Sequence, residues 1–479
     1  MAGPGSPIPT EKLATHAQSR ERLDVFIPKL LRALKQAQQP QQALTRLLPF
    51  VEAVARRSAY LLLLIENPQA LAQLVKLCDA SSWIAERLTK HPALLDELIN
   101  PSSLYQIPTQ VELAQELRQH MLRIEPTDLE AQMEGLRYFR WAQALKIAAC
   151  EVTGVLPLMR VSDCLTYLAE VIIDYAYNLA KDEMISKHGS LAGDGQNPAS
   201  LPFVIVAYGK LGGLELAHGS DLDLVFLHNS DPNSQTTGAK PIEASVFYPR
   251  LAQKLIHILA TKTASGELYE VDVRLRPSGN SGPLVASLTA FEKYQRESAW
   301  TWEHMALTRA RVLYGPEPGR AELRSIIAGV LTAPRDPAKL REDVLHMRGE
   351  MARHKPAKGP LDIKLARGGL VDVEFITHYL QLREGQGLEQ SLRGALALLV
   401  KAGLVPPAIE AANRTLGRFL IASRLLAPDA QEPPAAARAA LAQACQCEDW
   451  QQLAANLLAA RRTVAQCWHE VFGIELAVD

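Results

Sequence analysis

Two aspartates near the middle of the chain have the spacing of a metal-binding pair. Asp221 and Asp223 flank Leu222 at the start of an apolar run that continues to Leu227. Residues two apart on a strand face the same side, so both carboxylates should project together from the strand end. Mg²⁺ is usually held by one or two carboxylates together with substrate phosphates. The pair therefore indicates a site for a divalent metal on a triphosphate.

A glycine-rich segment precedes this pair. The apolar run Phe203–Tyr208 reads as a buried strand, and a turn follows it. Glycine permits positive φ and a close approach of the backbone to a ligand, so we expect this turn to lie over a triphosphate. The spacing matches neither the dinucleotide-binding fingerprint nor the P-loop. The candidate nucleotide-binding residues here are Gly209, Lys210, Gly212, Gly213, Gly219 and Ser220, of which Lys210 fits a phosphate contact and a solvated turn lysine equally well.

A third acid, Asp272, lies in segment 269–276, YEVDVRLR, in which apolar and charged residues alternate. This period of two predicts a strand with one packed face. If that strand lies beside the one that begins near Asp221, three carboxylates converge, and two metals could clamp the attacking and leaving oxygens of an in-line displacement. Arginines can hold phosphate oxygens by bidentate contacts. The basic candidates for the same pocket are Arg274, Arg276, Arg309, Arg311 and Lys364.

Each of these signals alone has an ordinary explanation. An Asp-x-Asp pair is often a solvated turn, and an alternating Asp/Arg strand is often an exposed face with cross-strand ion pairs. Their combination is far more specific, because the expected strands and turn agree with the motif. Weaker signals are Glu374 and His378, four apart and a poor metal pair without a third ligand, and His218, which reads as a polar turn residue.

Two further stretches border this region. Trp300 and Trp302 are expected to be buried and to anchor their segment, because tryptophan is large and apolar. Asp372 falls in the first turn of a predicted helix, where an acid complements the helix dipole. Lys364, just before that helix, is the residue expected to reach a nucleotide from the carboxy-terminal part of the chain.

Longer sequence segments narrow the class of protein to which the chain can belong. Segments 208–228, 271–295, 299–315 and 362–375 resemble glutamine synthetase adenylyltransferases, also called glutamate–ammonia-ligase adenylyltransferases, in the polymerase-beta type nucleotidyltransferase superfamily. Chains of that family usually carry two related halves, one that attaches AMP to a tyrosine of glutamine synthetase and one that removes it by phosphorolysis. This chain holds one motif set. Its Ser220–Asp223 and Trp300–His304 strings are similar to the attaching, carboxy-terminal half.

The resemblance implies an enzyme that transfers AMP from ATP to a tyrosine hydroxyl of glutamine synthetase, releases pyrophosphate and so regulates nitrogen metabolism. It implies that Asp221, Asp223 and Asp272 are catalytic and hold two Mg²⁺ ions, and that Asp272 orients or deprotonates the incoming hydroxyl. It also implies glutamine and a PII signalling protein as regulators. Three alternatives stay open: phosphorolytic removal of AMP, nucleotidyl transfer to RNA ends, and a non-catalytic module that senses glutamine and PII.

Composition restricts the partners. The formal net charge of −1 over 479 residues argues against broad attraction to nucleic acid. The apolar runs fall short of the ~20 residues that cross a bilayer. No amino-terminal signal pattern is present, and Met1–Ser6 reads as an expression scar. Six cysteines in so long a chain form no disulfide framework. We therefore expect a cytoplasmic enzyme with no nucleic-acid or membrane partner.

The pattern along the chain predicts a predominantly helical α+β fold. We expect a helical connector or regulatory region over 1–127, a nucleotidyltransferase catalytic domain with a small mixed sheet over 128–315, and a helical bundle over 316–479. Residues 128–186 read as one or two long helices, and a helix should run from Ala244 to about Thr263. Helix starts are expected at Asn67-Pro68, Ser81-Ser82 and His91-Pro92.

Overall fold

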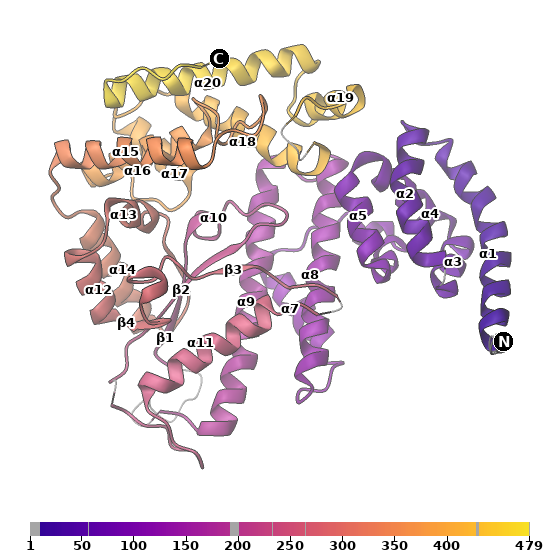
Figure 1. The fold of residues 1–479 in the computed structure, drawn as a ribbon, viewed down its shortest axis with the longest axis horizontal. Helices are drawn as coiled ribbons and strands as arrows, with labels where there is room; N and C mark the ends of the chain where they lie inside the picture. Colours follow the sequence, from indigo (N-terminus) through magenta and orange to yellow (C-terminus); the bar gives the residue numbers. More distant parts are fainter. Residues whose placement is uncertain are drawn as a thin grey trace, which may run out of the picture.

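The structure is a computed structural model that describes residues 10–55, 57–191, 201–231, 233–263, 265–427 and 431–478. Helices dominate these ranges, and one small mixed sheet lies among them (Figure 1). The predicted class, α+β and predominantly helical, is confirmed. The segment Met1–Ser6 lies outside the described residues.

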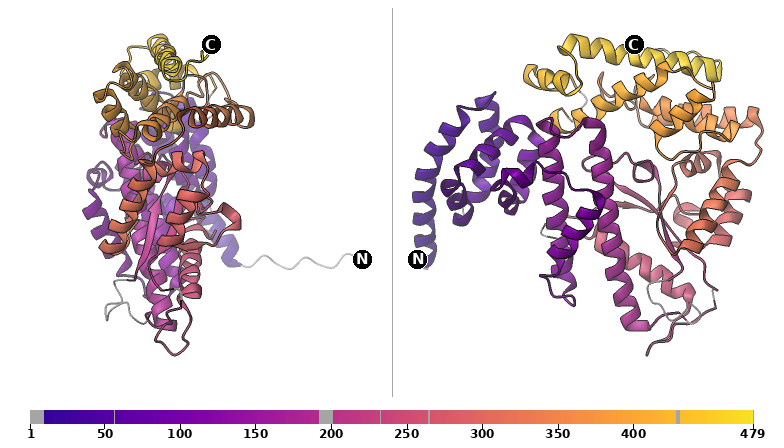
Figure 2. Two further views of the ribbon diagram at one scale, coloured as in Figure 1. Left: turned by 90° about the vertical axis from the view of Figure 1, so that its left-hand side faces the viewer. Right: turned by 180° about the vertical axis from the view of Figure 1, so that it is seen from behind.

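The amino-terminal helices form an arm at one side of the molecule (Figures 1 and 2). The expected helix starts are confirmed, since helical segments begin at Pro68, Ser82 and Pro92. The Ser81 hydroxyl accepts a hydrogen bond from the Ile84 backbone N–H and caps its helix. The arm has its own apolar cluster around Phe26, among others. Its elements are α1 (Thr10–Leu34), α2 (Pro40–Ala55), α3 (Ser58–Glu66), α4 (Pro68–Ala80), α5 (Ser82–Lys90), η1 (Pro92–Leu98) and α6 (Pro101–Leu104).

Two long helices join the arm to the sheet. They follow α7 (Gln110–Met121) and are α8 (Leu129–Val152) and α9 (Leu158–His188), which confirms the expectation for 128–186. The fully buried Arg137 of α8 donates from Nε to the Gly266 carbonyl at 2.9 Å. The predicted helix after Ala244 is α11 (Ala244–Ala260), three residues shorter than expected.

The sheet has the strand order β3-β2-β1-β5, with β4 also paired to β2. β1 (Phe203–Ala207) is fully buried and runs antiparallel to β2 (Leu222–His228) and to β5 (Arg311–Tyr314). β3 (Val271–Asp272) and β4 (Val285–Ser287) run parallel to β2. The glycine turn between β1 and β2 contains the short α10 (Gly209–Gly212).

The expected strand over 269–276 is wrong beyond Asp272. The chain turns there, and the Arg274 backbone N–H donates to Asp272 Oδ1 at 2.8 Å. The alternation has another cause: Val271 and Val273 pack against the cluster on one face of the sheet, and Leu275 packs against the cluster on the other. Turns can therefore imitate the period of a strand when successive side chains reach two different cores.

Helices cover both faces of the sheet. Alternate residues of β1 enter different clusters: Phe203 and Ile205 pack with α7, α8, α9 and α11, whereas Val204 and Val206 pack toward the carboxy-terminal helices. The latter helices are α12 (Leu288–Glu297), α13 (Thr301–Leu307), α14 (Glu317–Leu331), α15 (Pro337–His354), α16 (Leu370–Glu384), α17 (Leu392–Lys401), α18 (Ala408–Leu426), α19 (Ala435–Ala444) and α20 (Trp450–Phe472).

The apolar cluster that contains Val204 and the carboxy-terminal helices includes residues from Val204 to Phe472 and so crosses the domain boundary proposed at 315/316. The domain limits stay predictions. Among the described helices none alone has the length and hydropathy of a membrane span; α3 and α4 meet those criteria only as a pair, joined at a bend of 102°.

Candidate active site

The three aspartates meet at one edge of the sheet. Asp221 is exposed and directly precedes β2, whereas Asp223 is half-buried within it. β3 pairs with β2 in parallel register, so Asp223 and Asp272 are direct cross-strand partners. The Leu222 backbone N–H donates to the Glu270 carbonyl at 2.9 Å and fixes this register. The predicted adjacency of the two strands is confirmed.

The neighbouring carboxylates have opposite pKa shifts. Burial and the negative charges of Asp221 and Asp272 together raise the pKa of Asp223 to about 6, although the charges of Lys210 and Arg274 oppose them. The pKa of Asp272 is lowered, chiefly because the Arg274 side chain donates hydrogen bonds to it. Unbalanced negative charge therefore collects around Asp223.

Arg274 acts as the counter-ion of Asp272. Its Nε donates to both carboxylate oxygens, at 3.0 and 2.8 Å, although its side chain is 72% exposed. Within the described ranges, no three Asp, Glu, His or Cys side chains already converge as a metal site. The acids nevertheless suit divalent cations, which prefer carboxylate oxygens. Gly209 packs so closely against Asp223 that a Cβ at Gly209 would overlap Asp223 Oδ2.

Glycines shape the turn for two different reasons. Gly209 and Gly219 have φ of +55° and +76°, in the left-handed region that favours glycine. Gly212 and Gly213 instead allow Arg309 to pack closely, since a Cβ on either would overlap Arg309 atoms. These two glycines were expected to approach a ligand; the structure places them against the protein itself.

Three cations from separate parts of the chain lie near one another, and one of them, Lys210, lies near Asp221 and Asp223. Burial lowers the pKa of Lys210, and the nearby charges of Lys364 and Arg424 lower it further, while Asp221 and Glu374 oppose them. Lys210 Nζ also lies 3.5 Å from the Ser220 hydroxyl, which accepts a hydrogen bond from the Ala217 backbone N–H at 3.1 Å.

The repulsion among the positive charges of Lys210, Lys364 and Arg424 suits a site for a polyanion. Arg424, on α18, has a buried Nε that makes no hydrogen bond to the described part of the chain. Sequence reasoning missed Arg424, because an arginine in an amphipathic helix carries no distinguishing signal.

The other predicted arginines have structural partners. Arg309 is 9% exposed and lies between Glu215 and Glu374, 3.5 Å from the latter. Burial disfavours its cation, but these two acids outweigh that effect and raise the pKa of Arg309. It therefore joins the turn after β1 to α16.

Arg311 and Arg276, expected in the same basic pocket, also have partners within the protein. Arg311 donates from Nε to the Gly212 carbonyl at 3.1 Å and also pairs with Glu170 on α9. Arg276 donates from Nη1 to the Val273 carbonyl at 2.8 Å, within its own turn. Both guanidinium groups support turns of the backbone, a role that spacing along a strand cannot distinguish from phosphate contact.

The structure also shows the surroundings of the weaker candidate residues. His378 Nδ1 lies 2.8 Å from the Thr308 hydroxyl, and Glu374 pairs with Arg309, so these two residues do not form a metal pair. The expectation that Trp300 and Trp302 are buried is wrong, because they are 70% and 43% exposed. Glu303 is the buried residue of that segment and accepts hydrogen bonds from the Tyr294 hydroxyl and the Trp300 backbone.

A family model described as glutamate-ammonia ligase adenylyltransferase matches residues 71–325, more than half of the chain. The chain belongs to that family.

Its curated relatives share a name, bifunctional glutamine synthetase adenylyltransferase/adenylyl-removing enzyme. The protein from Pseudomonas putida is 51% identical over 377 residues, which are 76% of this chain and 39% of the relative. The protein from Pseudomonas syringae pv. tomato is 49% identical over 81% of this chain and 41% of its own length. The protein from Hahella chejuensis is 49% identical over 76% and 39%. The chain thus spans about two fifths of the length of these relatives.

Proposed function

We propose that this chain transfers AMP from ATP to a tyrosine hydroxyl of glutamine synthetase and releases pyrophosphate. The observation that carries the proposal is the parallel register of β2 and β3, which sets Asp223 beside Asp272. Lys210 lies close to the charges of Asp221 and Asp223, and Lys364 and Arg424 lie close to Lys210. An acidic edge facing a cationic group suits a metal-bound triphosphate. The relatives' name supports glutamine synthetase as the protein substrate.

In this mechanism the residues mainly position and neutralise charge. The Gly219-Ser220 turn and the cations would hold the triphosphate, while Asp221, Asp223 and Asp272 would hold two Mg²⁺ ions. Those ions, when bound, neutralise charge on the transferring phosphoryl group. Because its pKa is lowered, Asp272 is a weak base, so we assign it the orientation of the tyrosine hydroxyl more than its deprotonation. Positioning and charge neutralisation should supply most of the rate.

Removal of AMP from glutamine synthetase is the second candidate function, because the relatives' name includes adenylyl removal. The same acids would then position a phosphate that attacks an AMP-tyrosine and releases ADP. The strings Ser220–Asp223 and Trp300–His304 favour attachment. Glutamine and a PII signalling protein belong to the proposal as regulators.

Transfer of label from α-³²P-ATP to purified glutamine synthetase, with Mg²⁺, tests the proposal. Asp221→Asn and Asp223→Asn should each lose more than about 100-fold in rate, since even outer-shell partners of metal ligands cost 10–100-fold. Asp182→Asn is the matched control, because Asp182 is 74% exposed on α9. Phosphate-dependent ADP release from adenylylated synthetase, without labelling, would show that this chain removes AMP. Absence of both reactions would favour the sensing module.

A further inference from the structure

The turn that precedes Asp221 has few supports of its own. The Ser220 backbone N–H donates to the Ala217 carbonyl at 3.0 Å, and the Ser220 hydroxyl accepts from the Ala217 N–H. Gly219 is exposed, and a Cβ there would meet nothing within 4 Å. Leu216, at the start of the turn, is buried in an apolar cluster, but a loop segment with few contacts opens easily, so Gly219-Ser220 needs a further contact close to it.

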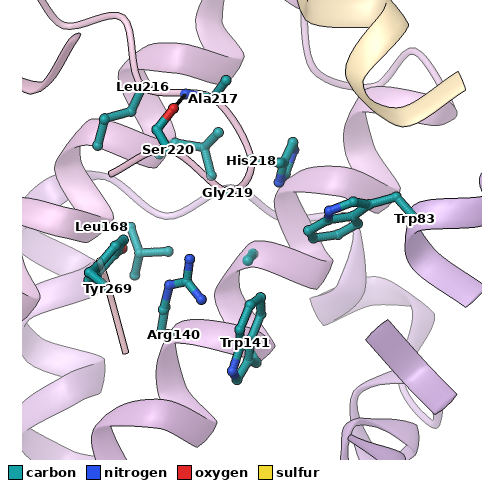
Figure 3. Close-up of a pocket in the computed structure, with 12 residues that line it drawn as sticks. Trp83, Arg140, Trp141, Leu168, Leu216, Ala217, His218, Gly219, Ser220 and Tyr269 are labelled. Atoms are coloured by element: carbon teal, nitrogen blue, oxygen red, sulfur yellow. Dashed lines mark hydrogen bonds between the residues drawn. The ribbon is translucent and has the colours of Figure 1, made fainter. Parts of the chain in front are cut away.

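His218 supplies that contact. Its side chain is 3% exposed and reaches α8, where Nε2 lies 3.1 Å from Glu151 Oε2. The ring centroid lies 4.7 Å from that of Trp83 on α5. Figure 3 shows His218 and Trp83 side by side at a small pocket whose far wall is formed by Trp141 and Arg140.

Filling this space with the buried Glu151–His218 pair costs more desolvation free energy than filling it with apolar side chains would. The Glu151 side chain is 3% exposed, and burial raises the pKa of Glu151 while His218 opposes that shift. Within the described residues, Glu151 Oε1 and His218 Nδ1 are both buried without a hydrogen-bond partner. Buried polar pairs seldom exceed well-packed apolar side chains in stability. What such a pair adds is a fixed orientation of its two side chains.

The same helix also supports the other acid-bearing strand. Arg137 of α8 is fully buried and donates to the Thr261 and Gly266 carbonyls, in the segment that leads into β3. α8 therefore contacts the approach to Asp272 through Arg137 and the approach to Asp221 through Glu151.

We propose that Glu151 and His218 are positioning residues that hold the Gly219-Ser220 turn in the geometry that receives a nucleotide triphosphate. Through them the amino-terminal helices support the active site without touching the substrate. This inference rests on the proposed function for the identity of the ligand, whereas the support of the turn by the pair is independent of it.

The experiment compares Glu151→Gln and His218→Gln with Glu97→Gln. Glu97 is the matched control, because it forms an ion pair at 3.3 Å with Lys146 on the same helix but lies away from the turn. Hydrogen exchange of the amides in 214–221 reports the turn, and calorimetric titration with MgATP reports binding. Both test variants should exchange faster in 214–221 only and should bind MgATP about 10–100-fold more weakly, as outer-shell partners do. Glu97→Gln should change neither.

A double variant, Glu151→Leu with His218→Leu, separates packing from positioning. Apolar replacement of a buried pair commonly keeps stability, so we expect parental unfolding with fast exchange of the turn and weak MgATP binding. Parental exchange in 214–221 in the single variants would overturn the proposal, as would faster exchange spread equally over α5 and α8. If the parent chain does not bind MgATP, the proposed function fails, while the exchange data still decide whether the pair holds the turn.

Discussion

Asp223 and Asp272 are one residue type in two electrostatic environments. Asp223 has a pKa raised to about 6, because it is buried between like charges, whereas Asp272 has its pKa lowered by Arg274. A pair with divergent pKa values commonly divides its tasks. Under the proposed function all three aspartates would hold the metal ions, and Asp272 would in addition be the carboxylate that stays ionised beside the incoming hydroxyl.

Gly209→Ala is expected to abolish most activity. The φ of +55° at Gly209 imposes a strain of about 1–2 kcal/mol on any other residue, and the new Cβ would also displace Asp223 Oδ2. Gly403→Ala is the control, because Gly403 has a φ of +72° but nothing within 4 Å of its Cβ. The two variants should lose similar stability in thermal unfolding, and Gly209→Ala alone should lose AMP transfer. Equal activity of the two would contradict this account of Gly209.

The acids could be predicted from sequence and the arginines could not. The Asp-x-Asp spacing and an apolar strand suffice to place Asp221 and Asp223, since side-chain direction on a strand follows from the period of two. Long cations have many rotamers, so their partners depend on tertiary contacts such as that of Arg311 with Glu170. Glu151 and His218 left no readable sign, because 67 residues separate the two members of the pair.

At the scale of elements, α15 and α16 are joined by a buried ion pair. Asp372 was expected only to complement the helix dipole, yet it is fully buried and accepts from Arg348 Nε and from the Gly368 backbone N–H at 2.7 Å. Arg348, on α15, is 2% exposed. The pair holds the turn before α16, which follows Lys364 in the chain.

Removing one partner of the Arg348–Asp372 ion pair should destabilise the protein more than replacing both partners. Arg348→Met or Asp372→Leu alone leaves a buried charge, at an expected cost of about 3–5 kcal/mol in the free energy of unfolding. The double variant should recover much of that loss. Chemical unfolding followed by circular dichroism gives the three values. A double variant less stable than both single variants would contradict this prediction.

The contact between α13 and α16 should weaken in acid. Burial, followed by the charge of Arg309, lowers the pKa of His378 to about 4, whereas the unfolded chain should titrate near the usual value of about 6.5. Between those values the unfolded state binds a proton that the folded state does not, so stability falls as pH falls through this window. His378→Gln removes that proton uptake, so its melting temperature should fall less than the parent's between about pH 7 and about pH 5. Parallel curves would refute the assignment.

The helices and the β1 strand were predictable, because each buries a continuous or regularly spaced apolar face. The failure lay in segment 269–276, where the strand comprises only Val271–Asp272. Eight residues of alternation cannot separate a strand from a turn whose side chains enter two cores. Only the pairing of β3 with β2, which is set by distant residues, makes the difference.

At the scale of the whole molecule, the described residues form three apolar clusters. The cluster of the arm also includes several residues within 141–149 of α8 and Leu425 of α18, and the Ser81 hydroxyl donates to the Leu425 carbonyl at 2.9 Å. The two other clusters lie on the two faces of the sheet. The active site therefore lies within the unit formed by these two clusters, outside the arm.

MgATP should consequently stabilise one unit more than the other. A ligand that binds only the folded state raises its stability by mass action. Scanning calorimetry should show two transitions, of which MgATP raises the one that contains the sheet and leaves that of residues 26–104 in place. Hydrogen exchange assigns the transitions, and Asp223→Asn should remove the shift. A single transition that moves as a whole would show that the arm unfolds together with the site.

The register of β2 and β3 has a consequence for sequence variation. Asp223 and Asp272 are set side by side by main-chain hydrogen bonds, such as that from Leu222 to Glu270, in strands whose Leu222 and Val271 side chains pack in one apolar cluster. A slip by one residue would turn Asp272 to the opposite face of the sheet. Changes of the surrounding apolar residues that keep the backbone pairing would keep the two acids side by side, whereas an insertion of one residue into either strand would eliminate the site in a single step.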